Sequence, residues 1–256
     1  MLLPNFYLDS LRYLSCRSLV SALPVLSPKT VGRLPLGLPV VDDVFPGFEN
    51  GDFVVLHGPV SNFILFDLCI RSQLPLSKSG LGSTTVFMDG GNVFNPYIVS
   101  EIARNYGLNP KNALEKIFVS RAFTAYQLSA LILEKLEKAL KRFKSKLIAV
   151  SHISSLFLDR DVPKTEAQDL FMKVCGKLEE IAKERSTIVV ASYNPRSSSS
   201  RRLFLEAVLL GRANIVFGFK ETRGRLKVSL HKHPKLKPFS IELRGKEARL
   251  TDFMEV

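Results

Sequence analysis

Short apolar segments separated by stretches of helical periodicity constrain the fold of this chain more than any other feature. Five such segments are rich in β-branched side chains, for example FVVLH and TIVVASY, and each is followed by a longer helical or polar stretch. Short strands that alternate with helices of ten or more residues predict βαβ units, and therefore a mostly parallel sheet buried on both faces. The expected strands are 53–57, 84–89, 117–121, 147–152 and 187–193, and the expected helices are 62–74, 96–106, 125–143 and 164–184.

The C-terminal part follows a different pattern. Segments 214–220, 225–230 and 239–243 alternate polar and apolar residues, and only turns separate them. This pattern predicts an antiparallel meander that extends one edge of the sheet. The fold class is therefore α/β, with a mostly parallel central sheet flanked by helices and a C-terminal antiparallel extension.

The N-terminal residues form a segment of their own. Apolar side chains between Phe6 and Leu23 recur at roughly helical spacing, and Pro24 and Pro28 follow them. We expect a helical or linker segment over residues 1–30, ahead of a single domain over residues 31–256.

Neither a membrane span nor a signal peptide is expected. No apolar run approaches the roughly 20 residues that a span needs, and the start lacks a basic cluster before an apolar stretch. The 3 cysteines lie far apart, which predicts neither a disulfide framework nor a zinc site. The sequence therefore favours a cytoplasmic protein without a membrane partner.

The net charge of +12 is unevenly distributed along the chain. Residues 1–100 contain six basic and seven acidic side chains, whereas residues 196–249 contain fourteen basic and four acidic ones. Such a basic region attracts polyanions such as nucleic acid, an acidic membrane or an acidic protein. A solvated lysine-rich surface would have the same composition, so charge alone does not choose the partner.

The order of the segments resembles the ATPase core of the RadA/RecA recombinases, and most closely the archaeal branch. The best-matching block is MDGGNVFNPYIVSEIARNYGLNPKNALEKIFVSRAFTAYQL, residues 88–128. The entry LPLGLPVVDDVFPGFENGD and the strands KLIAVSHISSLF and IVVASYNP follow the family in the same order. The resemblance implies a RecA-like core and a role in DNA recombination and repair.

The segment that corresponds to the family's phosphate loop lacks the residues that would bind phosphate and Mg²⁺. A loop of the form G-x-x-x-x-G-K-[ST] uses glycine amides, a lysine and a hydroxyl to hold phosphates and Mg²⁺. Here it reads HGPVSNFIL, which keeps Gly58 but places Phe63, Ile64 and Leu65 at the second glycine, lysine and hydroxyl positions. Because residues 34–70 contain no lysine or arginine, a shifted alignment cannot restore the charge.

Two further positions of the family's ATP site are also changed. The resemblance places Gly91 at the catalytic glutamate and Ser151 at the Walker B aspartate. His231 and His233 form a pair without a third ligand, so no metal site is expected. The resemblance thus implies a degenerate paralogue that lacks Walker A and Walker B residues. It would be no enzyme and would need no cofactor.

DNA contacts are expected at the basic residues. The tract NPRSSSSRR, residues 194–202, stands where the family has its second DNA-contacting loop, although a flexible linker would read the same. The family's first DNA loop corresponds to residues 158–164. The candidate DNA-binding residues are Arg196, Arg201, Arg202, Lys220, Arg223, Arg225, Lys227, Arg160 and Lys164.

Three functions remain open at this point. The leading hypothesis is a non-catalytic RecA-fold protein that binds single-stranded DNA without sequence preference and modulates recombination, alone or as a self-assembled oligomer. The alternative is a protein-interaction module that docks on an active RadA-type recombinase without binding DNA. The third is an ATPase with an unconventional site, which the missing lysine disfavours.

Overall fold

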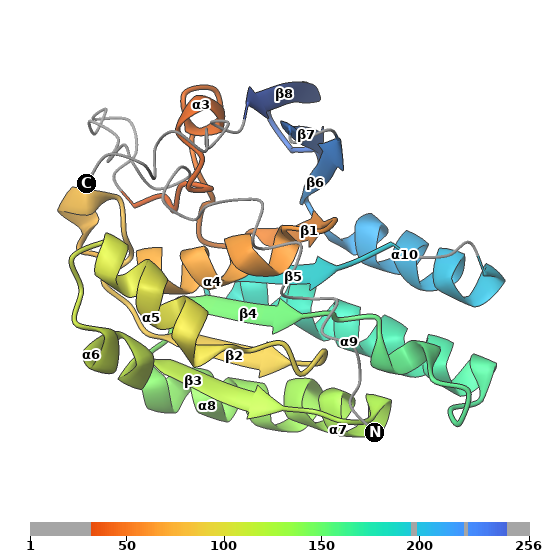
Figure 1. Cartoon of the computed structure of the whole chain (residues 1–256). Coiled ribbons are helices and arrows are strands. Elements are labelled where there is room, and N and C mark those ends of the chain that lie inside the picture. The colour runs from red at the N-terminus through yellow and green to blue at the C-terminus, as the bar shows by residue number, and fades with distance from the viewer. Residues whose placement is uncertain (1–31, 196–198, 223–224, 245–256) are drawn as a thin grey trace, which may run out of the picture.

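The structure is a computed structural model that describes residues 32–195, 199–222 and 225–244. One eight-stranded sheet in the order β3-β2-β4-β5-β1-β6-β7-β8 forms its centre (Figure 1). The strands are β1 (Phe53–His57), β2 (Thr85–Asp89), β3 (Ile117–Arg121), β4 (Leu147–Ser151), β5 (Ile188–Tyr193), β6 (Ile215–Thr222), β7 (Arg225–Lys232) and β8 (Phe239–Arg244).

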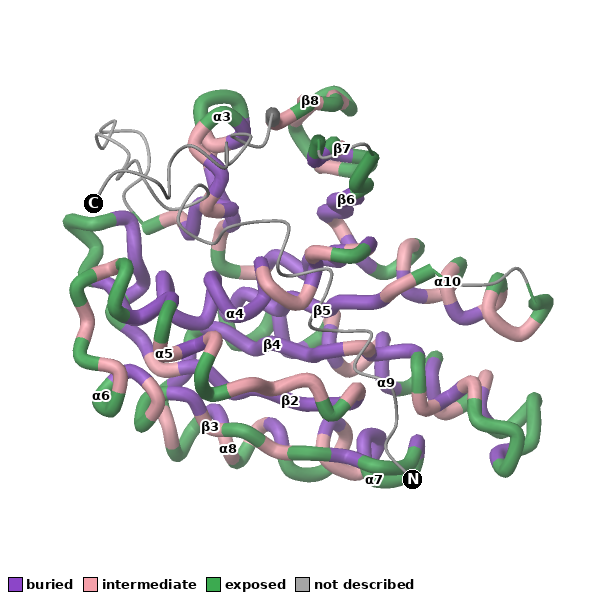
Figure 2. The backbone as a smooth tube through the Cα atoms, viewed as in Figure 1, coloured by how far each residue is buried: buried purple, intermediate pink, exposed green. Residues whose placement is uncertain are grey.

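Strands β1 to β6 are parallel to one another, and β7 and β8 continue the sheet in antiparallel fashion. This arrangement confirms the fold class that the sequence predicts. The reason is visible in the burial pattern, because β1, β2, β4 and β5 are buried along almost their whole length, as a sheet covered on both faces requires (Figure 2).

Helices cover both faces of the sheet and divide the core in two. Side chains of α4 and α5 pack on one face, and those of α7 to α10 pack on the other. The helical segments are α3 (Pro39–Asp42), α4 (Ser61–Arg71), α5 (Pro96–Asn105), α6 (Pro110–Glu115), α7 (Ala125–Ala130), a π-helical turn (Leu131–Lys135), α8 (Leu136–Phe143), α9 (Lys164–Glu184), α10 (Ser200–Arg212) and the short 3₁₀ turns Leu76–Lys78 and Leu156–Leu158.

The expectation of a loop through residues 194–202 was wrong at its C-terminal end. Residues 200–212 form helix α10, so Arg201 and Arg202 lie in its first turn. The side chain of Ser199 accepts a hydrogen bond from the backbone N–H of Arg202, as an N-cap does. Leu205 and Leu209, four residues apart, anchor the helix in the core.

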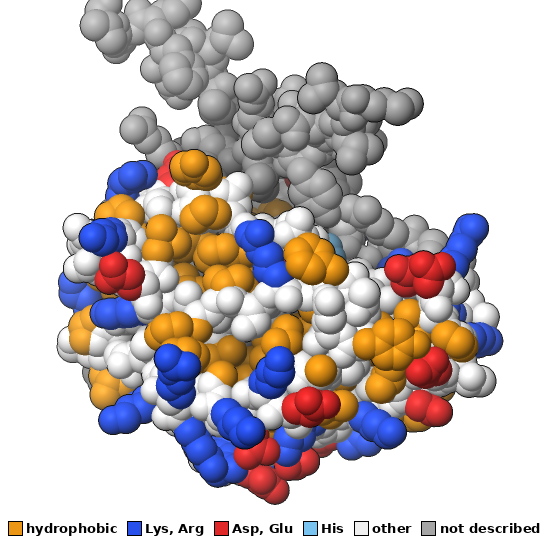
Figure 3. All heavy atoms as spheres, turned by 90° about the horizontal axis from the view of Figure 1, so that it is seen from below, with side chains coloured by type: hydrophobic (Ala, Val, Ile, Leu, Met, Phe, Trp, Pro, Cys, Tyr) orange, Lys and Arg blue, Asp and Glu red, His pale blue; other side chains and the backbone are white. Residues whose placement is uncertain are grey.

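Some expected features lie outside the described residues, namely the helical segment in residues 1–30 and the side chains of Arg196 and Arg223. Among the helices that are described, none is long and apolar enough to cross a membrane. On the face that Figure 3 shows, positive and negative side chains are mixed around hydrophobic ones, which is typical of a solvated surface.

Candidate functional site

The turn after β1 brings two backbone segments unusually close together. Gly58 has φ of +111°, and a Cβ atom at this position would collide with the carbonyl group of Phe219 on β6. Only glycine tolerates both the conformation and the contact. The N–H of Gly58 donates to the carbonyl of Tyr193, so the turn is also tied to the end of β5.

The start of α4 is built as ordinary hydrophobic core. Ile64 and Leu65 are 3% and 0% exposed and pack in the same cluster as the strands, with Phe63 half-buried beside them. The N–H groups of Ser61 and Ile64 donate to the carbonyls of Gly58 and Val60, so they are engaged within the turn.

A closed polar network links the start of α4 with the ends of β4 and β5. The backbone N–H of His152 donates to Oγ of Ser192 over 3.1 Å, and the Ser192 hydroxyl donates to Oδ1 of Asn62 over 2.6 Å. The amide Nδ2 of Asn62 then donates to Nε2 of His152 over 2.7 Å. The three side chains thus satisfy one another at the carboxyl edge of the sheet.

His152 adopts a left-handed backbone with φ of 45°. Its ring lies against Gly91, where an added Cβ would meet the ring at 2.8 Å or less. Gly91, which stands where the family has its catalytic glutamate, is therefore adjacent to the imidazole ring of His152. A larger residue at this position would displace that ring.

Asp89 at the end of β2 is fully buried and serves the local backbone. Its two carboxylate oxygens accept hydrogen bonds from the N–H groups of Val93 and Phe94 at 3.0 Å each. The hydroxyl of Ser151 donates to Oδ1 of Asp89 over 2.7 Å, and Nε of Arg121 lies 3.7 Å from Oδ2. The hydroxyl of Ser151 thus helps to hold the Asp89 carboxylate in position.

Three aromatic rings stack beside the turn after β1. The ring of His57 lies 5.2 Å from that of His231 and 5.4 Å from that of Tyr193, between centroids. Burial, and then the neighbouring His231, lowers the pKa of His57 to about 4. This imidazole therefore stays neutral at neutral pH and acts as a packing group.

Arg201 and Arg202 are held in place at the N-terminus of α10. Nε of Arg201 donates to the carbonyl of Phe157 over 2.7 Å, and Nη1 of Arg202 donates to the carbonyl of Asn194 over 3.1 Å. Nη2 of Arg201 and Nε of Arg202 have no hydrogen-bond partner in the structure. Glu206 lies one turn along the helix, and burial raises the pKa of its carboxyl group.

The other candidate DNA-binding residues fall into two groups. Arg160 is exposed in the connection from β4 to α9 and Lys164 is exposed at the first residue of α9, both close in sequence to the Phe157 carbonyl that Arg201 contacts. Lys220 and Lys227 are exposed partners on β6 and β7, and Arg225 lies 3.7 Å from Glu242. Arg160, Lys164, Arg201 and Arg202 thus lie on two segments that are linked by the hydrogen bond from Arg201 to Phe157, whereas Lys220, Lys227 and Arg225 lie on the meander strands.

Asn62 and Ser192 are site residues that the sequence reasoning missed. Both are common surface residue types, and they lie 130 positions apart, so no local pattern connects them. Among the residues that the structure describes, no group of three His, Cys, Asp or Glu side chains is placed to hold a metal ion.

A comparison with family models matches residues 53–200 to the Rad51 family. The matched range begins with the first residue of β1 and ends at the first residue of α10. It therefore contains the turn at Gly58, the polar network and the connection from β4 to α9.

Proposed function

The chain belongs to the Rad51 family of RecA-like recombinases, and from this membership we propose that it is a non-catalytic member that binds single-stranded DNA. Its role would be to assist or restrain a filament-forming recombinase during recombination and repair. The observation that carries the proposal is the pair of ordered arginines at the start of α10.

The geometry around Arg201 and Arg202 supports an anion contact. Each half-buried guanidinium is oriented by one hydrogen bond to a backbone carbonyl, and one nitrogen atom in each is buried without a partner. Because these two nitrogen atoms are buried, a phosphate would contact the accessible remainder of the two guanidinium groups, where charge-assisted hydrogen bonds are strong. The helix N-terminus adds its own positive partial charge.

The surroundings of the two arginines fit a phosphate backbone. Arg160 in the neighbouring connection and Lys164 at the start of α9 are exposed and add two cations, although the exposed Asp159 and Asp161 flank Arg160. Contacts of this kind neutralise phosphates without reading base edges, so binding would be independent of sequence.

The absence of ATP hydrolysis is the second part of the proposal. Phosphoryl transfer in this fold depends on a lysine and a Mg²⁺ ion that neutralise the triphosphate. Ile64 and Leu65 are buried apolar side chains, and the hydroxyl of Ser151 donates a hydrogen bond to Asp89. We infer that these residues do not fit a magnesium-bound triphosphate, and no catalytic step is assigned to them.

A salt titration of single-stranded DNA binding tests the proposal. If about four phosphates are neutralised, the slope of log K against log salt is about −3 for single strands. Replacing Arg201 and Arg202 together by alanine is expected to flatten that slope by about 1.4 and to weaken binding to all sequences alike.

A charge-matched double variant provides the control. Lys111 and Lys116 are exposed on and just after α6, at the opposite end of the parallel strands. Replacing both by alanine removes the same charge and is expected to leave the slope unchanged. An unchanged slope in the Arg201 and Arg202 variant would contradict the assignment of the site.

A protein-docking function is the second candidate, and one observation favours it. Among the described strands, β3 stands at one edge of the sheet, with Val119 36% exposed on it and Phe123 64% exposed just beyond it. An open edge with apolar side chains can pair with a strand of another protein. A complete lack of DNA binding at low salt would favour this function over the first.

A further inference from the structure

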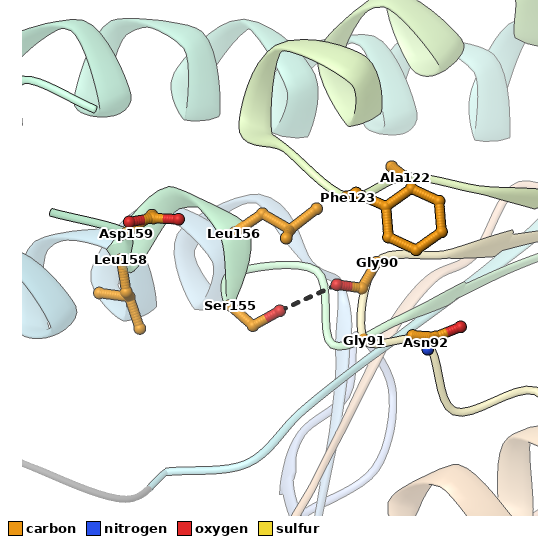
Figure 4. Close-up of a pocket in the computed structure, with 9 residues that line it drawn as sticks. All are labelled: Gly90, Gly91, Asn92, Ala122, Phe123, Ser155, Leu156, Leu158 and Asp159. Carbon is orange, nitrogen blue, oxygen red and sulfur yellow. Dashed lines mark hydrogen bonds between the residues drawn. The ribbon is translucent and has the colours of Figure 1, made fainter. Parts of the chain in front are cut away.

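A cavity of about 400 Å³ opens beside the polar network at the carboxyl edge of the sheet (Figure 4). Three connections meet there, namely those that follow β2, β3 and β4. The lining residues are Gly90, Gly91, Asn92, Ala122, Phe123, Ser155, Leu156, Leu158 and Asp159. The cavity is widely open to solvent, so a group bound there would remain partly exposed.

The topology explains why a crevice forms at this place. β2 and β4 are adjacent and parallel, but the chain leaves them toward opposite faces of the sheet. The connection after β2 leads to α5 in one half of the core, and the connection after β4 leads to α9 in the other half. Such a divergence opens a crevice outside the carboxyl ends of the strands, where open α/β sheets bind ligands.

The chemistry of the lining points to a flat, uncharged group with a polar edge. The ring of Phe123 forms one wall, and the side chains of Leu156 and Leu158 lie in the same pocket. Asn92 and Asp159 supply polar groups, whereas the lining contains no lysine or arginine. An anionic ligand would find no counter-charge within this pocket, but an aromatic heterocycle could stack on Phe123.

The cavity is next to the arginine pair. Arg201 donates to the carbonyl of Phe157, and Phe157 stands between the two lining residues Leu156 and Leu158 in the 3₁₀ turn. A phosphate held at Arg201 and Arg202 would therefore be close to a pocket suited to an aromatic ring. One nucleotide contains both of these parts.

We infer that the cavity holds one base of the single-stranded DNA whose backbone binds at Arg201 and Arg202, an inference that rests on the proposed function. The base stacks on Phe123 and turns its polar edge toward Asn92, which lies at the same end of the pocket in Figure 4. The side-chain amide of Asn92 can both donate and accept hydrogen bonds, so it does not choose among the bases, in agreement with sequence-independent binding.

Three oligomers of equal length separate base binding from backbone binding. An oligodeoxycytidylate, an oligothymidylate and an abasic oligodeoxynucleotide carry the same phosphates but differ in what they offer the pocket. The full chain is expected to bind the oligodeoxycytidylate about 5- to 100-fold more tightly than the abasic oligomer, the range that stacking of a base on an aromatic side chain provides.

Two variants assign the effect to the cavity. Phe123→Ala is expected to abolish the preference for bases over the abasic oligomer while the affinity for that oligomer and the salt slope remain unchanged. Tyr97→Ala is the matched control, because this ring is 84% exposed on α5 and does not line the cavity.

The outcomes distinguish this inference from the function on which it rests. Equal binding of all three oligomers with an intact salt slope would overturn the base pocket and leave DNA binding standing. An intact preference for bases over the abasic oligomer in Phe123→Ala would also overturn it, because the base would then bind elsewhere. Absence of binding to every oligomer at low salt would reject both proposals.

Discussion

The side-chain amide nitrogen of Asn62 lies 2.7 Å from Nε2 of His152, a residue 90 positions further along the chain. The direction of this hydrogen bond follows from its neighbours. Oγ of Ser192 accepts from the backbone of His152 and donates to the amide oxygen of Asn62. The amide NH₂ must therefore face the imidazole, so Nε2 carries no proton in this arrangement.

Removing the amide should destabilise the fold. Asn62→Ala leaves Nε2 of His152 and the hydroxyl of Ser192 without their partner, which costs about 1–3 kcal/mol of the free energy of unfolding. Urea denaturation measures the loss. Asn112→Ala, on the exposed side of α6, serves as the control and should change stability by less than about 0.5 kcal/mol. Equal stability of the two variants would show that the network contributes nothing.

ATP turnover should be absent, and a restored lysine should not bring it back. Ile64→Lys introduces the missing charge at a position that is 3% exposed, where burial opposes the charged form. We expect the variant to lose about 4 kcal/mol of stability and neither protein to release phosphate above background. Turnover by the unmodified chain that persists through a second purification would contradict the proposal of a non-catalytic protein.

Replacing either of two glycines by alanine should change the free energy of unfolding in opposite directions. Gly58→Ala forces a Cβ onto the Phe219 carbonyl at φ of +111°, so we expect a loss of well over about 1 kcal/mol. Gly176→Ala, within α9 and with nothing inside 4 Å of its added Cβ, should gain about 0.5–1 kcal/mol through helix propensity. Thermal or urea unfolding of both variants compares the signs directly, and a shared sign would contradict the structure at one of the two positions.

Asp42 should make stability depend on pH. Burial, only partly offset by Arg71 and by hydrogen bonds from the backbone of Leu36 and Gly37, raises the pKa of its carboxyl group from 3.8 to about 6. A raised folded-state pKa means that the folded protein binds the proton more tightly. The stabilisation is thus fully present below pH 3.8 and is lost as the pH rises through about 6.

The variant Asp42→Asn isolates this effect. Between about pH 7 and pH 5 the free energy of unfolding of the unmodified chain should rise by about 1 kcal/mol relative to that of the variant. Other titrating groups, His57 among them, act in both proteins and cancel in the difference. Parallel pH profiles would show that Asp42 titrates normally in the folded state.

The parallel strands could be predicted because their signal is local. FVVLH and TIVVASY are β-branched runs that only a doubly covered sheet can bury, and both became central strands. Helix α10 was missed although its signal was present. The serine run drew attention to flexibility, but Ser199 as a cap and Leu205 and Leu209 at helical spacing describe a helix.

The polar network could not be predicted from the sequence. Asn62, His152 and Ser192 come together only because β1, β4 and β5 end at the same edge of one sheet. The cavity has the same origin, since Phe123 and Asp159 belong to connections after different strands. Contacts of this kind are a property of the assembled fold, and local patterns carry no record of them.

The central place of β1 in the sheet has a consequence for the synthesis of the chain. Of the strands that the structure describes, β1 is the first to be synthesised, yet it pairs with β5 and β6, and Phe53 meets Val189 as its partner. The apolar side chains and the backbone hydrogen-bonding groups of β1 therefore have no partner strand until most of the protein has been translated. Contacts this distant in sequence slow folding and expose strands to aggregation. We expect a nascent chain released before β6 to depend on chaperones, while the same chain released after β8 folds unaided.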